Sequence, residues 1–157
     1  MSVTVKTGNL FVNPSDILVN PVNCVGTMGK GLALEFKRRY PENYEYYMRM
    51  YKESLLKMTS GILPCELKTT EPPPVYIVNF ATKVHWRDTS RYDDIEYGLK
   101  MLNNFLRGLD DGEVSSISIP ALGCGLGGLE WRYVKPLILD FAEDVPNEIN
   151  VIIFEPK

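Results

Sequence analysis

The chain has 157 residues, is 45% hydrophobic and carries a formal net charge of −3. A chain of this length can bury one sizeable core but is short for two, so we expect one domain over residues 1–157. The acidic balance excludes binding to nucleic acid through bulk positive charge, because domains of that kind carry a strong basic excess. A local basic patch is still compatible with this composition.

Cysteine usage and the N-terminus indicate the cellular setting. Cys24, Cys65 and Cys124 are odd in number and lack C-x-x-C spacing, and His85 is the only histidine. This pattern predicts neither a disulfide framework nor a structural zinc site. The sequence shows no signal peptide and no apolar run of membrane-spanning length. We therefore expect a soluble cytoplasmic protein and a monomer, with no metal, no cofactor and no membrane partner.

The first two predicted strands are Val3–Lys6 and Ile17–Asn20, separated by a loop rich in turn-forming residues. The second is apolar without alternation, which is typical of a central strand covered on both faces. Three glycines follow within residues 26–31, and a helical pattern then runs to Tyr40. The helix should stop there because Pro41 disfavours α geometry in the residue before it. A buried strand, a glycine-rich loop and a helix start place bare backbone amides where an anion can bind.

Two common nucleotide-binding motifs do not fit this first glycine-rich loop. Gly29-Lys30 resembles the core of a P-loop, which also needs a glycine five residues before that glycine and a Ser or Thr after the lysine. Those positions are Cys24 and Gly31. The G-x-G-x-x-G dinucleotide fingerprint is not matched either. The segment is therefore predicted to be a phosphate-binding loop of another kind.

The middle of the chain alternates helices and strands. Glu42–Lys57 is predicted as a helix, because aromatic and aliphatic residues recur there at spacings of three and four and form an apolar face for the core. Ile62–Leu67 and Val75–Phe80 are predicted strands, joined by a loop that three prolines stiffen. Tyr92–Leu109 has the pattern of a further amphipathic helix.

A second glycine-rich loop, residues 120–128, follows a predicted strand at Ser116–Ile119. A helix beginning near Trp131 and a last strand at Val151–Phe154 complete the pattern, with Pro136 compatible only with a first turn or a kink. Strands that alternate with helices predict a three-layer α/β/α sandwich around a mixed, largely parallel sheet of about six strands. Ligands bind beyond the carboxyl ends of such strands. The two glycine loops should therefore line one crevice and suit a ligand with two phosphates.

Four segments carry a resemblance to a known family. They are Val19-Asn20-Pro21-Val22-Asn23, Gly29-Lys30-Gly31, the second glycine loop from Ile119 to Leu129, and the block Asn79-Phe80-Ala81-Thr82-Lys83-Val84-His85-Trp86-Arg87. Together they resemble a macrodomain, the ADP-ribose-binding fold, and the likeness spans nearly the whole chain. The last block is similar to the DarG-type branch, which is related to the terminal ADP-ribose glycohydrolase macrodomains.

The resemblance implies an activity and partners. DarG members of this branch use a lysine to remove ADP-ribose from thymidine in DNA and so reverse a paired toxin. Lys83 is the matching lysine. The implied partners are ADP-ribose or an ADP-ribosylated substrate, single-stranded DNA and a cognate ADP-ribosyltransferase toxin. DarG-like antitoxins also have a C-terminal region that binds the toxin, so we expect either a macrodomain fragment or a free-standing homologue.

The resemblance also implies a set of site residues. The expected catalytic group is Lys83, His85 and Asn23, with Asn23 orienting the distal ribose. The expected contacts with ADP-ribose are Gly8, Asn9, Leu10, Asn20, Asn23, Met28, Gly29, Lys30, Gly31, Leu32, Thr82, Pro120, Leu122, Gly123, Cys124, Gly125, Leu126, Gly127, Gly128 and Phe154. Asn9 stands where the family has an Asp that contacts adenine, so weaker or altered base selection is expected. Gly127 stands where some glycohydrolases carry a catalytic Asp, whereas DarG-like members carry Gly.

The residues leave several roles open. Lys83 either attacks the anomeric carbon as an amine or stays charged and stabilises the departing base. His85 would lie on the same side as Lys83 in extended chain and could pass a proton to the base; otherwise it is a loop residue. Cys24 and Cys124 are expected to be inert, because nothing visible lowers their pKa.

The rim residues and the overall function also allow alternatives. Trp86, Arg87 and Arg91 form either a stacking and phosphate-contact surface for a nucleic-acid strand or a core contact with paired arginines. Phe154 either lies against adenine or packs in the core. The leading hypothesis is hydrolysis of ADP-ribosyl-thymidine in single-stranded DNA through Lys83. The alternatives are a phosphatase for ADP-ribose 1″-phosphate, a hydrolase of acyl-linked ADP-ribose, and a non-catalytic ADP-ribose-binding module.

Overall fold

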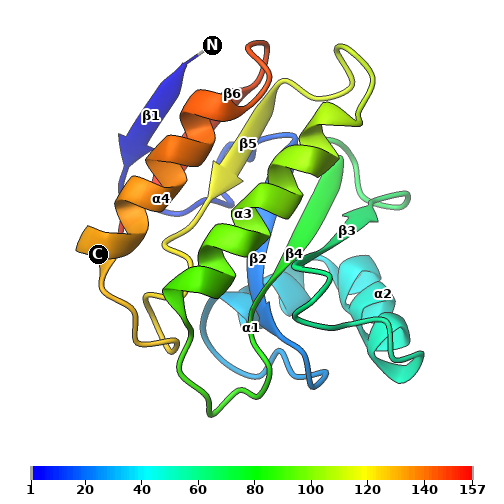
Figure 1. Ribbon diagram of the computed structural model, residues 1–157. Coiled ribbons are helices and arrows are strands. Elements are labelled where there is room, and N and C mark those ends of the chain that lie inside the picture. The colour runs from blue at the N-terminus through cyan, green and yellow to red at the C-terminus, as the bar shows by residue number, and fades with distance from the viewer. Residues whose placement is uncertain (1, 157) are drawn as a thin grey trace.

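The computed structural model describes residues 2–156 and shows a six-stranded sheet with helices on both faces (Figure 1). In chain order the elements are β1 (Val3–Lys6), β2 (Ile17–Asn23), α1 (Gly31–Arg39), α2 (Pro41–Lys52), β3 (Ile62–Glu66), β4 (Tyr76–Lys83), α3 (Tyr92–Arg107), β5 (Ser116–Ile119), α4 (Trp131–Asp144) and β6 (Asn150–Phe154). In Figure 1, α3 and α4 lie in front of the sheet and α1 lies behind it. The predicted three-layer α/β/α arrangement is confirmed.

The sheet is mixed and largely parallel, as predicted. Its strand order is β1-β6-β5-β2-β4-β3, and β3 alone among these six runs antiparallel to its neighbour. Parallel neighbours must be joined by long crossovers, which place helices over the faces of the sheet. The carboxyl ends of β2, β4 and β5 therefore meet at one edge, the lower edge in Figure 1.

Alternate side chains of β2 enter two separate apolar layers. Ile17 and Val19 pack in the core cluster that includes residues of α3 and α4, whereas Leu18 packs in the cluster that includes Phe36 of α1. This follows from the two-residue period of a strand. All four side chains are 0% exposed, and full burial of an apolar side chain of this size contributes about 1.5–3 kcal/mol. The prediction of a central strand covered on both faces is confirmed.

An opening arises in the sheet because β2 pairs with β4 over more residues than it pairs with β5. Its pairing with β5 covers Ile17 and Leu18, while its pairing with β4 continues to Asn23. Past Leu18, the side of β2 toward β5 has no strand partner among the described residues. Proline, which lacks an N–H, is tolerated where a strand has a free edge, and Pro21 stands in this stretch. The opening lies between the loops that follow β2 and β5.

The predicted ends of α2 and β4 are wrong. α2 ends at Lys52 rather than Lys57, because Ser54 adopts a φ of +61° that no helix allows. Leu55, predicted on the core face of that helix, is 54% exposed. β4 continues past Phe80, since its last residues pair with β2. Pro136 lies inside α4, beyond the first turn.

Within residues 2–156, every helix is too short or too polar to cross a membrane.

Candidate active site

A crevice of about 720 Å³ opens at the carboxyl edge of the sheet, between the loops that follow β2, β4 and β5. This volume falls within the range of about 300–1,000 Å³ that is usual for small-molecule sites. Both glycine loops and the end of β4 contribute to the wall. The wall residues are Gly8, Leu10, Pro21, Val22, Asn23, Thr27, Gly29, Lys30, Gly31, Leu32, Ala33, Thr82, Lys83, Trp86, Pro120, Ala121, Gly123, Cys124, Gly125, Leu126, Gly127, Phe154, Glu155 and Pro156.

The first glycine loop ends at the N-terminus of α1. Gly31 begins the helix with a φ of +60°, a conformation that glycine adopts at little cost. Lys30 is the N-cap residue, and its side chain makes no hydrogen bond to the first turn. The first amides of a helix have no partner within it and carry partial positive charge. This end of α1 is therefore suited to an anion such as phosphate.

Asn23 holds the first glycine loop in shape. Its Nδ2 donates to the carbonyl oxygen of Thr27 at 2.8 Å, and its Oδ1 accepts from the N–H groups of Val25 and Thr27 at 3.1 and 3.3 Å. The hydroxyl of Tyr47 lies 2.9 Å from the same Oδ1. Helical periodicity predicts that Tyr47 is buried, but nothing in the sequence predicts this contact. An amide nitrogen has two hydrogens, so Asn23 keeps one for a ligand in the crevice.

An irregularity in strand pairing brings Lys83 beside Asn23. Val22 pairs with Ala81, but the next residue of β2, Asn23, pairs with Lys83. Thr82 is thus an extra residue on β4, and its hydroxyl donates to the carbonyl oxygen of Val22 at 3.1 Å. Extra residues of this kind redirect side chains and are frequent next to active sites. Asn23 and Lys83 consequently end neighbouring strands on one crevice wall.

The amino group of Lys83 has no hydrogen-bond or ion-pair partner in the described part of the chain. Its Nζ is buried and makes no hydrogen bond to any atom of residues 2–156. None of the ion pairs in this part of the chain includes it. Burying a polar group without a hydrogen bond costs free energy, and native structures keep few such groups. A ligand that places an acceptor beside Nζ would remove this cost.

Ser90 joins the second glycine loop to the segment after β4. The N–H of Ser90 donates to the carbonyl oxygen of Gly127 at 2.9 Å. A Cβ atom on Gly127 would lie 2.5 Å from Ser90 Oγ and 2.6 Å from the carbonyl oxygen of Gly123, closer than real Cβ atoms approach. An aspartate at position 127 would therefore require the loop to move. Sequence reasoning missed Ser90, since a serine in a loop carries no signal of its own.

His85 does not lie on the crevice wall. β4 ends at Lys83, so the extended geometry that would carry His85 to the same side as Lys83 does not continue. The Nδ1 atom of His85 instead accepts a hydrogen bond from the N–H of Arg87 at 3.1 Å. The position of His85 therefore does not support a role in proton transfer to the substrate.

Comparison with known proteins agrees with this arrangement. The model of the Macro domain family matches residues 19–138, which contain both glycine loops and Lys83. The chain belongs to the macro domain family.

The curated relatives whose names include DNA ADP-ribosyl glycohydrolase are longer proteins. One of them, "DNA ADP-ribosyl glycohydrolase" from Mycobacterium tuberculosis, is 37% identical over 155 residues, which cover 99% of this chain and 42% of the relative. A fusion protein from Thermosipho africanus, named DNA ADP-ribosyl transferase-DNA ADP-ribosyl glycohydrolase, is 31% identical over 169 residues and is covered to 42%. The chain thus spans about two fifths of the length of these DNA ADP-ribosyl glycohydrolase relatives.

The macro domain is similar in structure to solved DarG macrodomains. The macrodomain of Thermus aquaticus DarG is 40% identical, with a TM-score of 0.88 over 98% of both chains. Thermosipho africanus DarTG, solved in complex with ADP-ribose, is 30% identical, with a TM-score of 0.87 over 99% of this chain and 42% of that one. The resemblance to the DarG branch is confirmed.

Three residues predicted to contact ADP-ribose lie in the core of the macro domain instead. Asn20, Met28 and Leu122 are 0%, 2% and 0% exposed and are absent from the crevice wall. Asn20 Nδ2 donates to Asn79 Oδ1 at 3.1 Å. A motif match transfers the position of a residue but not the direction of its side chain, and neighbouring side chains on a strand point to opposite faces.

The end of the crevice where adenine was expected differs from the prediction. Asn9 is not a wall residue there, whereas Phe154 and Glu155 are, and in the second glycine loop Gly128 is not a wall residue either. Asn9 Oδ1 already accepts a hydrogen bond from the N–H of Phe11 at 2.9 Å. Because Asn9 is not a wall residue, the structure does not support its predicted contact with an adenine amino group. Phe154 is 7% exposed, so its ring serves both the core and the wall.

The cysteines are not poised for nucleophilic chemistry. All three are free, and burial raises the pKa of Cys24 and of Cys124 to about 11. Cys124 is a wall residue. At neutral pH both are neutral thiols, which are poor nucleophiles. The geometry therefore does not support a cysteine hydrolase, in agreement with the sequence-based expectation.

Proposed function

We propose that this macro domain hydrolyses the bond that joins ADP-ribose to a thymidine base in single-stranded DNA. The observation that carries the proposal is the amino group of Lys83, which is buried at the crevice wall without a hydrogen-bond partner in residues 2–156 and lies on the strand next to that of Asn23. The name of the Mycobacterium tuberculosis relative, DNA ADP-ribosyl glycohydrolase, supports DNA as the modified molecule.

Binding would use the two glycine loops. The diphosphate of ADP-ribose suits the amides at the start of α1 and those of the second loop, because both present bare backbone to the crevice. Leu10 and Phe154 offer apolar surface for the adenine, and Asn23 offers its remaining amide hydrogen to the distal ribose. The complex of Thermosipho africanus DarTG with ADP-ribose supports this ligand.

Cleavage would depend on the charge of Lys83. The bond between the anomeric carbon of the distal ribose and the base breaks, and its electron pair leaves with the base. Water supplies a hydroxyl group to the carbon and a proton to the base. A fixed positive charge stabilises such a leaving group. In this scheme water attacks the carbon and no covalent bond to the lysine forms, so we assign Lys83 the charged role rather than that of an amine nucleophile.

The modified DNA would come from a cognate ADP-ribosyltransferase. The Thermosipho africanus relative supports this part of the proposal, because its name assigns a DNA ADP-ribosyl transferase and a DNA ADP-ribosyl glycohydrolase to one chain.

The proposal is tested by incubating the wild-type chain with three substrates. They are a single-stranded oligonucleotide that carries ADP-ribosyl-thymidine, ADP-ribose 1″-phosphate, and a peptide with acyl-linked ADP-ribose. We expect multiple-turnover release of ADP-ribose from the oligonucleotide, at the highest rate of the three. Phosphate release without oligonucleotide turnover would instead identify a phosphatase. Calorimetric binding of ADP-ribose without turnover of any substrate would identify a binding module.

A further inference from the structure

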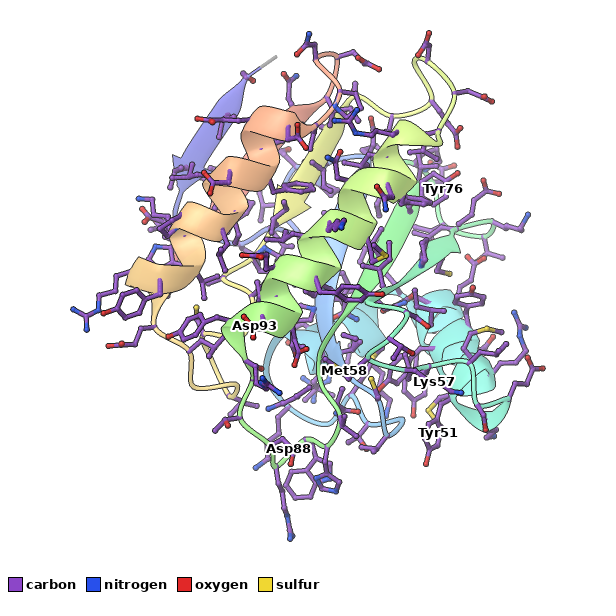
Figure 2. All side chains as sticks on the ribbon, viewed as in Figure 1. Tyr51, Lys57, Met58, Tyr76, Asp88 and Asp93 are labelled. Atoms are coloured by element: carbon purple, nitrogen blue, oxygen red, sulfur yellow. The ribbon has the colours of Figure 1, made fainter. Side chains whose placement is uncertain are left out.

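A four-residue turn follows β4 and is fixed by its own hydrogen bonds. The N–H of Asp88 donates to the carbonyl oxygen of His85 at 2.9 Å, and Asp88 Oδ2 accepts from the N–H of His85 at 3.0 Å. The N–H of Arg87 donates to His85 Nδ1 at 3.1 Å. Figure 2 shows Asp88 at the lower end of the molecule, in the segment between β4 and α3. Three bonds within four residues hold Trp86 and Arg87 at the corner of the turn.

The corner presents an aromatic side chain at the crevice. Trp86 lies on the crevice wall, three residues after Lys83, and is 43% exposed. Leu126 of the second glycine loop, also a wall residue, is 68% exposed. Both side chains are therefore available to a ligand that extends out of the crevice. Of the two alternatives for Trp86, this exposure favours the surface contact over core packing.

Arg87 adds a guanidinium without an ion-pair partner among residues 2–156 to the same corner. Its guanidinium carbon lies 4.6 Å from the centre of the Trp86 ring. Among residues 2–156 it forms no ion pair, whereas Arg91 pairs with Asp93 at 3.8 Å. The nearest acid in sequence, Asp88, is already engaged by the N–H of His85. The chain as a whole carries a net charge of −3. The corner nevertheless presents a guanidinium beside an indole ring.

We propose that Trp86 and Arg87 form a subsite for the DNA strand next to the cleaved linkage, an inference that rests on the proposed function. The indole would contact a base that adjoins the modified thymidine, and the guanidinium would contact a backbone phosphate. Aromatic rings bind single-stranded bases with little sequence preference, because every base has a π face. A phosphate in turn suits the planar donors of arginine. His85 and Asp88 are positioning residues that fix the corner.

The test compares a long with a short substrate. The kcat/KM of Trp86→Ala and of Arg87→Gln is measured on an ADP-ribosylated single-stranded oligonucleotide and on the ADP-ribosyl-thymidine nucleoside. We expect each variant to lose about tenfold more activity on the oligonucleotide than on the nucleoside. Arg87→Gln should also flatten the salt dependence on the oligonucleotide, since one phosphate contact is lost.

A matched control comes from a second aromatic and arginine pair. Arg132 stacks on Tyr133 with its guanidinium carbon 4.7 Å from the ring centre, and neither residue is on the crevice wall. Tyr133→Ala and Arg132→Gln should leave the ratio of the two substrates unchanged. If Tyr133→Ala or Arg132→Gln changed this ratio as much as Trp86→Ala does, the subsite would be overturned. Equal losses of kcat/KM on the oligonucleotide and on the nucleoside in Trp86→Ala would also overturn it.

Variants of His85 separate positioning from proton transfer. His85→Asn keeps a side-chain acceptor close to the place of Nδ1 and should retain oligonucleotide activity, whereas His85→Ala should lose it as Trp86→Ala does. Loss in both variants on both substrates would contradict the positioning role and restore an acid-base role.

Failure of the proposed function would be recognisable separately. If the wild type cleaves neither substrate, the subsite is tested by calorimetry with the modified oligonucleotide and with ADP-ribose. Tighter binding of the oligonucleotide that disappears in Trp86→Ala supports the subsite. Equal affinities of the wild type for both ligands overturn it.

Discussion

Asn23 and Lys83 lie at the carboxyl ends of neighbouring strands, but only the side chain of Asn23 forms hydrogen bonds within residues 2–156. The amide of Asn23 is engaged by Thr27, Val25 and Tyr47, so this residue mainly fixes the first glycine loop. Lys83 Nζ has no protein partner among residues 2–156. A side chain already satisfied by the protein shapes a site, whereas a buried unsatisfied group is available for a ligand. We therefore expect removal of Lys83 to affect chemistry and removal of Asn23 to affect loop structure.

The raised pKa of Cys124 predicts slow modification. With a pKa of about 11 the folded thiol is protonated at neutral pH. Alkylation of native Cys124 by iodoacetamide at pH 7.5 should be more than about 100-fold slower than alkylation of the unfolded chain, where thiols have a pKa near 8.5. The rate should rise about tenfold per pH unit until the pH reaches the pKa of the folded thiol. A plateau between pH 7 and 8 would show a reactive thiolate instead.

At the residue scale, sequence predicts the position of Lys83 but not its surroundings. The block around Lys83 marks it as a site residue, and the structure places it on the crevice wall. Whether Nζ has a hydrogen-bond partner depends on which side chains other segments place near it. A local sequence pattern does not contain that information. Asn20 and His85 illustrate the same limit: one faces Asn79 in the core, and the other lies beyond the end of β4.

At the element scale, the two glycine loops are constrained in different ways. The first is held by the side chain of Asn23 and leads into α1. The second is packed against the segment after β4, through the Ser90 N–H and the contact of Ser90 with Gly127. The segment after β4 thus supports both the second loop and the turn that carries Trp86. Movement of this segment would therefore displace both the second glycine loop and Trp86.

This packing predicts that alanine substitutions at two glycines of the second loop have different effects on the free energy of unfolding. Gly127→Ala should lower the free energy of unfolding by about 1–3 kcal/mol, because its Cβ would clash with Gly123 backbone and Ser90 Oγ. Gly125→Ala should change it little, since no atom lies within 4 Å of the corresponding Cβ. Thermal or urea unfolding of the two variants measures the difference. Equal stability of both would contradict the described packing of the loop.

Element types were predictable from the sequence and element ends less so. Apolar runs and helical spacing predict all six strands and four helices of residues 2–156. The end of α2 was missed, because apolar spacing continues to Leu55 after the backbone has left the helix at Ser54. The end of β4 was missed because Thr82 and Lys83 are held by pairing with β2. Both errors concern contacts between segments that are distant in sequence.

At the scale of the whole molecule, the crevice follows from the layout of the sheet. β2 continues along β4 after its pairing with β5 has stopped, and the loops after these strands close around the gap. Alternation of strands and helices predicts that both glycine loops lie at the carboxyl edge. The stagger of β2 against β5 depends on strand lengths, so the size of the gap was not predictable.

The central claim is that the glycine loops bind ADP-ribose while Lys83 carries the chemistry. The most direct measurement compares Lys83→Met with Lys30→Met, a second wall lysine at the N-cap of α1. Single-turnover cleavage of the ADP-ribosylated oligonucleotide and the calorimetric Kd for ADP-ribose are determined for both. Lys83→Met should lower the cleavage rate about 10³-fold while raising the Kd less than tenfold. Lys30→Met should weaken binding with little change in the rate at saturation. Cleavage by Lys83→Met at a rate within tenfold of the wild type would contradict the assignment of the chemistry to Lys83.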